Sequence, residues 1–221
     1  MIFLAWLFNK KHSEIKIVLA TLAVIIMMPI ISVVVFASSG FALVQDVLAN
    51  LNPITHLVEI FNPDGEKIAE LELTTVWPSR GYVSDEFGTW EQWRKDLGLG
   101  PHSGIDIAND VGLPGEPITP FIAGKVIKVD YDGGDDCGVF VKVRHDHNIT
   151  SLYCHMLTAL AIEGQDVQQG TIIGLMGSTG ESTGPHLHFG VYVYDIPVNP
   201  RIFMVGEPER STVRRVLDLA N

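Results

Sequence analysis

Residues 182–190 read STGPHLHFG and place His186 and His188 one residue apart, between glycines, in a chain with 8 histidines. In a β-strand, side chains two residues apart point to the same face. A strand here would set the two imidazoles side by side, which favours a metal site or an acid/base pair. The alternative is a polar strand face or a chance pair in a loop, because a histidine pair alone is a weak signal.

The sequence around this stretch is typical of an all-β protein. Short runs of β-branched and aromatic residues follow one another after Trp77, separated by Gly, Pro and Asp. Such spacing predicts an antiparallel β-sandwich or a barrel-like fold. The runs are KVIKVDY at 125–131, VFVKVRH at 139–145, ITSLYCHM at 149–156, TIIGLMG at 171–177 and LHFGVYVY at 187–194. Upstream, two alternating stretches flank NPDG at 62–65, which predicts a β-hairpin.

The N-terminal part of the chain predicts a membrane span. From Ile17 to Val44, 28 residues carry no formal charge, whereas a spanning helix needs about 20 apolar residues. Lysines 10, 11 and 16 precede this run, so the positive-inside rule places the N-terminus in the cytoplasm and the rest outside. The alternative is a signal peptide cleaved within VFASSGFA at 35–42, which would release a secreted protein.

The charge of the exported part limits its partners. Residues 45–221 carry 12 of the 15 basic residues and 25 of the 26 acidic ones. Nucleic-acid binding depends on lysines and arginines that neutralise phosphates, so we expect no nucleic-acid partner.

Two further clusters contain residues that bind metals or transfer protons. GPHSGIDIANDVG at 100–112 places His102 in a glycine-rich loop, four residues before Asp106 at the start of an expected strand, and LYCHM at 152–156 contains His155. Imidazole and carboxylate are common zinc ligands. A nitrogen from the HLH pair would complete three protein ligands and leave the fourth position to water, as in catalytic zinc sites.

Taken in order, the segments HSGID, YCH and GSTGESTGPHLHF resemble the lysostaphin/LytM-type zinc metallopeptidases of bacterial cell walls, over roughly Gly81 to Met204. The resemblance implies that the metal ligands are His102, Asp106 and His188. It assigns His155 and His186 to catalysis, without saying which of the two acts as the base.

The resemblance also implies Zn²⁺ as the cofactor, a groove in an all-β domain, and peptidoglycan peptides as the substrate of a membrane-anchored endopeptidase. A catalytically inactive module that binds the wall or activates another hydrolase is the alternative, although all five site residues are present. The expected parts are a cytoplasmic N-terminus at 1–16, a transmembrane helix at 17–44, a tether with a hairpin at 45–78, a zinc peptidase domain at 79–205 and a tail at 206–221.

Several residues near the motifs carry secondary expectations. His145 and His147 form a second histidine pair, which we expect to be exposed in a turn between strands. By strand alternation, Tyr153 should share a face with His155, and Cys154 should point away from it.

Two points remain open on the sequence alone. Cys137 and Cys154 are expected on neighbouring antiparallel strands, which permits a disulfide in an oxidising compartment. Residues 45–80 either cover the groove or space the domain from the membrane, and we favour spacing.

Overall fold

The computed structural model describes residues 47–72, 76–96, 98, 100–110 and 112–211. They belong to one compact unit that begins at Gln45. The expected span at 17–44 and most of the tail lie outside these ranges. Within the described ranges, no helix is both long and apolar enough to cross a membrane.

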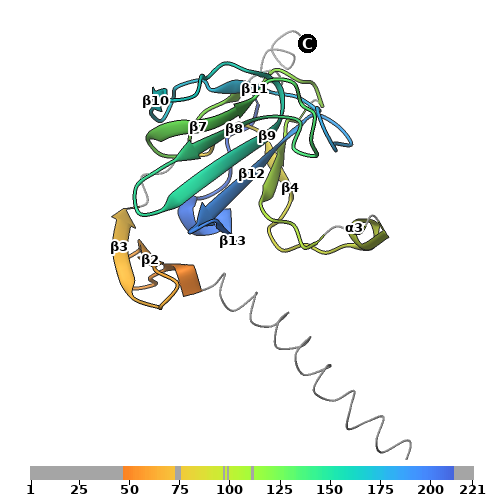
Figure 1. Ribbon diagram of the computed structural model, residues 1–221. Coiled ribbons are helices and arrows are strands. Elements are labelled where there is room, and N and C mark those ends of the chain that lie inside the picture. The colour runs from red at the N-terminus through yellow and green to blue at the C-terminus, as the bar shows by residue number, and fades with distance from the viewer. Residues whose placement is uncertain (1–46, 73–75, 97, 99, 111, 212–221) are drawn as a thin grey trace, which may run out of the picture. The chain divides into compact units, whose positions relative to one another are not determined.

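A sheet of ten antiparallel strands forms the body of the domain (Figure 1). Its main path runs in the order β10, β7, β8, β9, β12, β5, β4. Strand β11 pairs with β9 and β6, and β13 pairs with β12. The strands are β4 (Tyr82–Asp85), β5 (Ile105–Ala108), β6 (Pro117–Ile118), β7 (Gly124–Asp130), β8 (Val139–Arg144), β9 (Ile149–Ala159), β10 (Asp166–Val167), β11 (Gly174–Met176), β12 (His186–Val193) and β13 (Ile196–Val198). The expectation of an all-β domain is confirmed.

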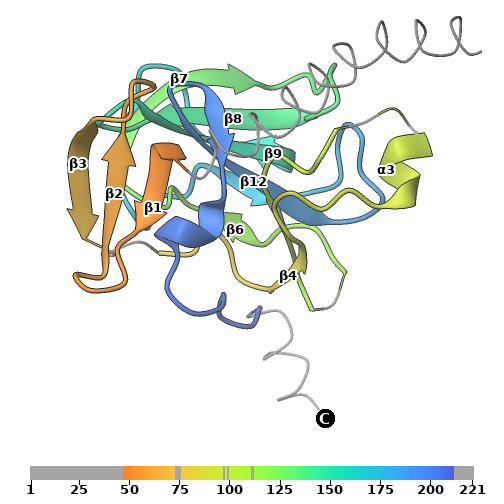
Figure 2. The same ribbon diagram turned by 90° about the horizontal axis from the view of Figure 1, so that it is seen from below.

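A second, three-stranded sheet contains the predicted hairpin. Its strands are β1 (Ala49–Leu51), β2 (Leu57–Phe61) and β3 (Lys67–Glu72), and the turn of the hairpin includes Gly65 at φ 84°. β1 contacts the 3₁₀ helix η2 (Pro200–Phe203), which follows β13. β13 pairs with the last three residues of β12, Val191–Val193, so this sheet lies at the end of β12 opposite to His186. Figures 1 and 2 both show β1–β3 across the domain from the short helix α3 (Gln92–Asp96).

Strand β12 shows how the sequence pattern positions the site. Leu187, Phe189 and Val191 are fully buried, whereas His186 and His188 on the other face are only partly buried. The Phe189 ring stacks on Tyr153 at a centroid distance of 5.4 Å. Burial of a side chain of this size contributes about 1.5–3 kcal/mol. The apolar face therefore anchors the strand while the histidine face stays available.

Strand β9 departs from the expected alternation. Tyr153 lies in the core opposite Phe189, whereas Cys154 lies opposite His188 and so shares its face. The register against β8 shifts beside these residues, and His155 adopts the left-handed conformation, with φ 61°. A bulge of this kind resets which face each side chain takes. The expectations that Tyr153 shares the face of His155 and that Cys154 points away from it were therefore wrong.

The second histidine pair was only half correctly predicted. His147 is exposed in the turn between β8 and β9, as expected. His145 is buried, and its ring lies within hydrogen-bonding distance of the Ala123 carbonyl and of the Ser151 hydroxyl, at 2.8 and 2.7 Å. The turn begins at Asp146, whose carbonyl accepts from the Ile149 amide. His145 precedes this turn, and its ring is directed into the core.

Candidate metal centre and active site

Three side chains converge where β5 and β12 run side by side. His188 lies directly opposite Asp106 in the strand register, so both point to the same face. His102 comes from the loop before β5, and Gly104 lets this loop cross β12. A Cβ at Gly104 would lie 2.5 Å from the Phe189 carbonyl oxygen and 2.9 Å from the His188 ring. Only glycine fits at this crossing without displacing the strand or the ring.

The converging atoms match a metal site in distance and chemistry. His102 Nε2 lies 3.0 Å from Asp106 Oδ1, His188 Nδ1 lies 2.9 Å from the same oxygen, and the two nitrogens are 2.9 Å apart. A tetrahedral ion with ligands at about 2.0–2.1 Å would require ligand atoms roughly 3.3 Å apart. Among the described residues, this triplet is the group that can hold a metal ion. Small outward movements would accommodate the ion.

The surroundings of Asp106 and His188 favour the protonation states that a metal requires. Burial raises the pKa of Asp106, but hydrogen bonds from His102 and His188 outweigh it and hold this pKa well below its usual range. Burial lowers the pKa of His188. Metal ligands must be deprotonated, so an ionised Asp106 and a neutral His188 suit the task.

Two more histidines lie beside the triplet and are not part of it. The rings of His155 and His186 are 4.6 Å apart, and His155 is 6.2 Å from the His188 ring, measured between centroids. His155 Nδ1 is 2.8 Å from the Thr179 carbonyl oxygen, and His186 Nδ1 is 2.8 Å from that of Gly184. Each ring therefore donates through Nδ1 and leaves Nε2 as the nitrogen that can accept a proton.

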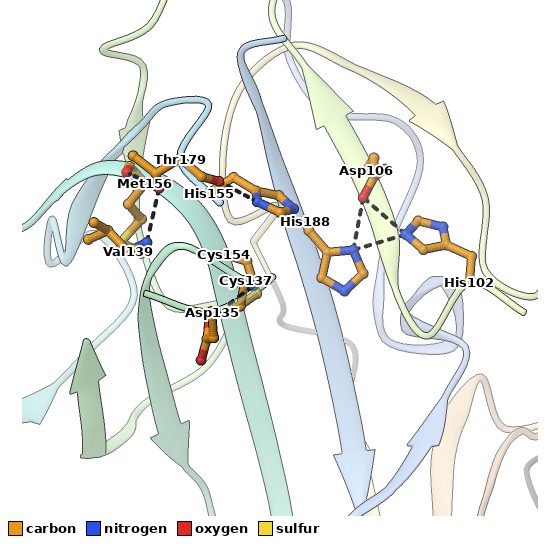
Figure 3. Close-up of a disulfide and its surroundings, with 10 residues drawn as sticks. All are labelled: His102, Asp106, Asp135, Cys137, Val139, Cys154, His155, Met156, Thr179 and His188. Atoms are coloured by element: carbon orange, nitrogen blue, oxygen red, sulfur yellow. Dashed lines mark hydrogen bonds and ion pairs between the residues drawn. A yellow bond between two sulfur atoms is a disulfide. The ribbon is translucent and has the colours of Figure 1, made fainter. Parts of the chain in front are cut away.

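The electrostatics of His155 favour its neutral form. Burial and the neighbouring His186 lower the pKa of His155 to about 4. At neutral pH the ring is then an acceptor at Nε2. Figure 3 shows His155 and His188 on neighbouring strands, with Asp106 and His102 beyond His188.

A supporting layer around His102 was not predicted from the sequence. His102 Nδ1 donates to the Glu86 carbonyl at 3.0 Å and lies 3.4 Å from Asp85 Oδ2. Asp85 is in turn paired with Arg94 from α3 at 3.2 Å and accepts a hydrogen bond from Thr89 at 2.7 Å. Through Arg94 and Asp85, the short helix α3 thus helps to hold the ring of His102, a candidate ligand, in place. In the sequence, Asp85 lies in the stretch SDEFG at 84–88, which has no distinctive pattern that would mark it as part of a site.

Other polar residues near the motifs have structural partners. Asn109 Oδ1 accepts from the Leu113 amide at 3.1 Å, so it closes a turn. The Tyr153 hydroxyl is buried and accepts from the Phe121 amide at 3.1 Å. Cys137 and Cys154 form a disulfide with a Cα–Cα distance of 5.0 Å.

The candidate site lies in a region of the chain that resembles a known protein family. Residues 100–200, which include all five of these site residues, match the model of Peptidase family M23.

Individual relatives agree with this family. An uncharacterized metalloprotease of Haemophilus influenzae is 40% identical over 143 residues, which are 63% of this chain and 29% of that protein. The peptidoglycan DD-endopeptidase ShyA of Vibrio cholerae is 35% identical over 101 residues, which are 46% of this chain and 22% of ShyA. The chain thus spans about a quarter of the length of these relatives.

A solved structure gives the same fold. The crystal structure of a zinc containing peptidase from Vibrio cholerae superimposes with a TM-score of 0.50 at 28% identity. The match covers 69% of this chain and 47% of that one.

Proposed function

We propose that residues 79–205 form a zinc-dependent endopeptidase that hydrolyses peptide bonds in peptidoglycan. The observation that carries the proposal is the convergence of two imidazole nitrogens and one carboxylate oxygen within 3.0 Å of one another, with two more histidines beside them. Two histidines and one aspartate are a donor set typical of catalytic zinc, with a position left for water. Homology to a peptidoglycan DD-endopeptidase supports the substrate class.

The five residues divide into two roles in this proposal. His102, Asp106 and His188 hold the ion, which when bound polarises the peptide carbonyl and lowers the pKa of its water to about 7. His155 and His186 act in proton transfer. One imidazole accepts a proton from the attacking water, and the other stabilises the oxyanion or protonates the leaving amine. Their fixed Nδ1 hydrogen bonds direct both Nε2 atoms to this exchange.

We further propose that residues 17–44 anchor the protein in the cell membrane and that the peptidase lies on the extracytoplasmic side. The charge-free run and the lysines before it support this orientation. The disulfide also supports it, because such bonds persist in oxidising compartments. Secretion after signal cleavage is the alternative, which N-terminal sequencing of the cell-associated protein distinguishes.

Residues 45–78 act as a spacer in this proposal. The sheet β1–β3 contacts η2 at the end of β12 opposite to His186, so the described part of the segment leaves the site open. Deletion of residues 49–72 should therefore leave turnover unchanged, whereas an increase would show that the segment inhibits.

The function is tested on purified peptidoglycan with the full chain in detergent. The protein is compared as zinc-loaded, as chelated, and as His186→Ala, with His147→Ala as a matched histidine control. We expect zinc-dependent release of new amino termini that is lost in His186→Ala and retained in His147→Ala. Binding of zinc and of wall material without cleavage of any wall type would instead favour the non-catalytic module.

A further inference from the structure

The Cys137–Cys154 disulfide lies immediately beside the two histidine-bearing strands. Cys154 precedes His155 on β9 and lies opposite His188 on β12. Cys137 belongs to the loop that leads into β8, and the bond ties this loop to β9 (Figure 3). The bond therefore ends one residue away from a candidate catalytic side chain.

The crosslinked loop holds the His155 backbone directly. The His155 amide donates to the Cys137 carbonyl at 2.8 Å, because the bulge in β9 has removed it from the regular ladder. His155 has φ 61°, a left-handed conformation that is unfavourable for any residue other than glycine. Such a conformation persists only where its surroundings hold it in place. Here the surroundings are the Cys137 carbonyl on one side and the crosslinked Cys154 on the other.

The same loop also holds the group that orients the His155 ring. The carbonyl of Thr179 accepts from His155 Nδ1 at 2.8 Å. The side-chain Oγ1 of the same residue accepts from the Val139 amide at 2.9 Å. In addition, the Glu181 amide donates to the Asp136 carbonyl at 2.8 Å. The loop at 135–139 therefore connects the backbone of His155 to the carbonyl that fixes its tautomer.

The two loops meet with backbone against backbone. A Cβ at Gly138 would lie 2.5 Å from the Thr179 carbonyl, and a Cβ at Gly180 would lie 2.4 Å from the Gly138 nitrogen. Both glycines also have positive φ, at 66° and 69°. No side chain separates the loops, so displacement of one loop displaces the other.

We propose that the disulfide is a positioning element for His155: it fixes the left-handed backbone of this residue and, through Thr179, the direction of its Nε2. The proposal rests on the proposed function, because it assigns the disulfide a role in that hydrolysis. The metal ligands come from β5, the loop before it and β12, none of which the bond joins. Opening the bond should therefore reduce turnover without releasing the metal.

The test opens the bond in the full-length, zinc-loaded protein. A water-soluble phosphine reduces the disulfide to two thiols, takes up an oxygen atom from water and becomes the phosphine oxide, so electrons and protons balance. Thiol alkylation and mass measurement verify the opening. A Cys137→Ala/Cys154→Ala variant is assayed in parallel, because it lacks the bond without supplying thiols that bind zinc.

We expect kcat on wall fragments to fall about 10- to 100-fold, since small misplacement of a catalytic group has effects of this size. KM, zinc content and cooperative unfolding should stay close to those of the oxidised protein, and reoxidation should restore kcat. Unchanged kcat after verified opening would overturn the proposal. So would a loss of zinc or of folding in parallel with kcat, because that result would assign the bond a purely structural role.

A spectroscopic measurement separates this proposal from the proposed function. If the oxidised protein cleaves no wall preparation, the endopeptidase function fails on its own. The ring-nitrogen resonances of His155 then report its position directly. Reduction should shift them and leave those of buried His145 unchanged, whereas unshifted His155 resonances would overturn the positioning role.

Discussion

Two histidine pairs of the same spacing, His186/His188 and His145/His147, have opposite fates in this molecule. The first pair lies at the start of β12, where His188 faces the Asp106 carboxylate. The second spans the end of β8 and its turn, where His145 meets a carbonyl and a hydroxyl and His147 is exposed. The spacing of two histidines therefore does not define a site. A site is defined instead by the groups that the neighbouring strand places opposite the two histidines.

The largest difference between the pairs should come from removal of one histidine from each. His188→Ala removes a candidate metal ligand, so bound zinc should fall from about one ion per chain to near zero, with loss of hydrolysis. His147→Ala should change neither quantity. Elemental analysis after gel filtration and the wall assay measure both variants. Full zinc occupancy in His188→Ala would contradict the ligand set.

The buried member of the second pair should instead control stability at acidic pH. Burial lowers the pKa of His145 to about 4, against 6.5 for a free imidazole. The unfolded chain thus binds this proton more readily than the folded chain does. The contribution of neutral His145 to the free energy of unfolding is fully present above about pH 6.5 and declines as the pH falls toward 4. The loss reaches about 3 kcal/mol below pH 4.

The measurement is urea unfolding of the chelated protein at several pH values between 7 and 4. His145→Gln cannot take up the proton, so its unfolding free energy should decline less steeply than that of the wild type. His147→Gln, from the same pair, should retain the wild-type slope. Equal slopes for the wild type and His145→Gln would show that His145 does not titrate in this range.

A smaller effect should follow from the support of His102. Asp85 lies 3.4 Å from His102 Nδ1 and is held by Arg94 and Thr89. Loss of an outer partner of a metal-binding histidine typically costs about 10- to 100-fold in metal affinity. Asp85→Asn should weaken zinc binding by this amount, as measured by competition with a chelator. Asp64→Asn, in the exposed hairpin turn, is the control and should leave the affinity unchanged.

Sequence reasoning predicted the elements with a regular period and missed those that depend on a departure from it. The face shared by His186 and His188 follows from strand alternation. The reversed roles of Tyr153 and Cys154 do not, because a bulge in β9 shifts that alternation by one residue. Bulges have no fixed sequence signature, since the partner strand decides where the extra residue is accommodated.

The support around the site was unpredictable for a different reason. The Thr179 carbonyl and the Cys137 carbonyl are backbone atoms, which every residue possesses, and their role arises only from the tertiary contact. Asp85 is one acid among 26 acidic residues. Motifs therefore indicated the candidate metal ligands and catalytic side chains, whereas the groups that hold them in place became visible only in the structure.

The smallest effect should come from the turn that contains His147. The Ile149 amide donates to the Asp146 carbonyl at 3.2 Å, and the two central residues, His147 and Asn148, both have φ 58°. This is the backbone of a type I′ turn, for which Asn-Gly is the preferred pair. His147→Asn/Asn148→Gly should therefore stabilise the domain by about 0.5–1 kcal/mol, measured as a shift of the urea midpoint at pH 7. Zinc content and turnover should remain those of the wild type, because the exposed His147 contributes only to a turn. A decrease in either quantity would mean that the second histidine pair is linked to the site.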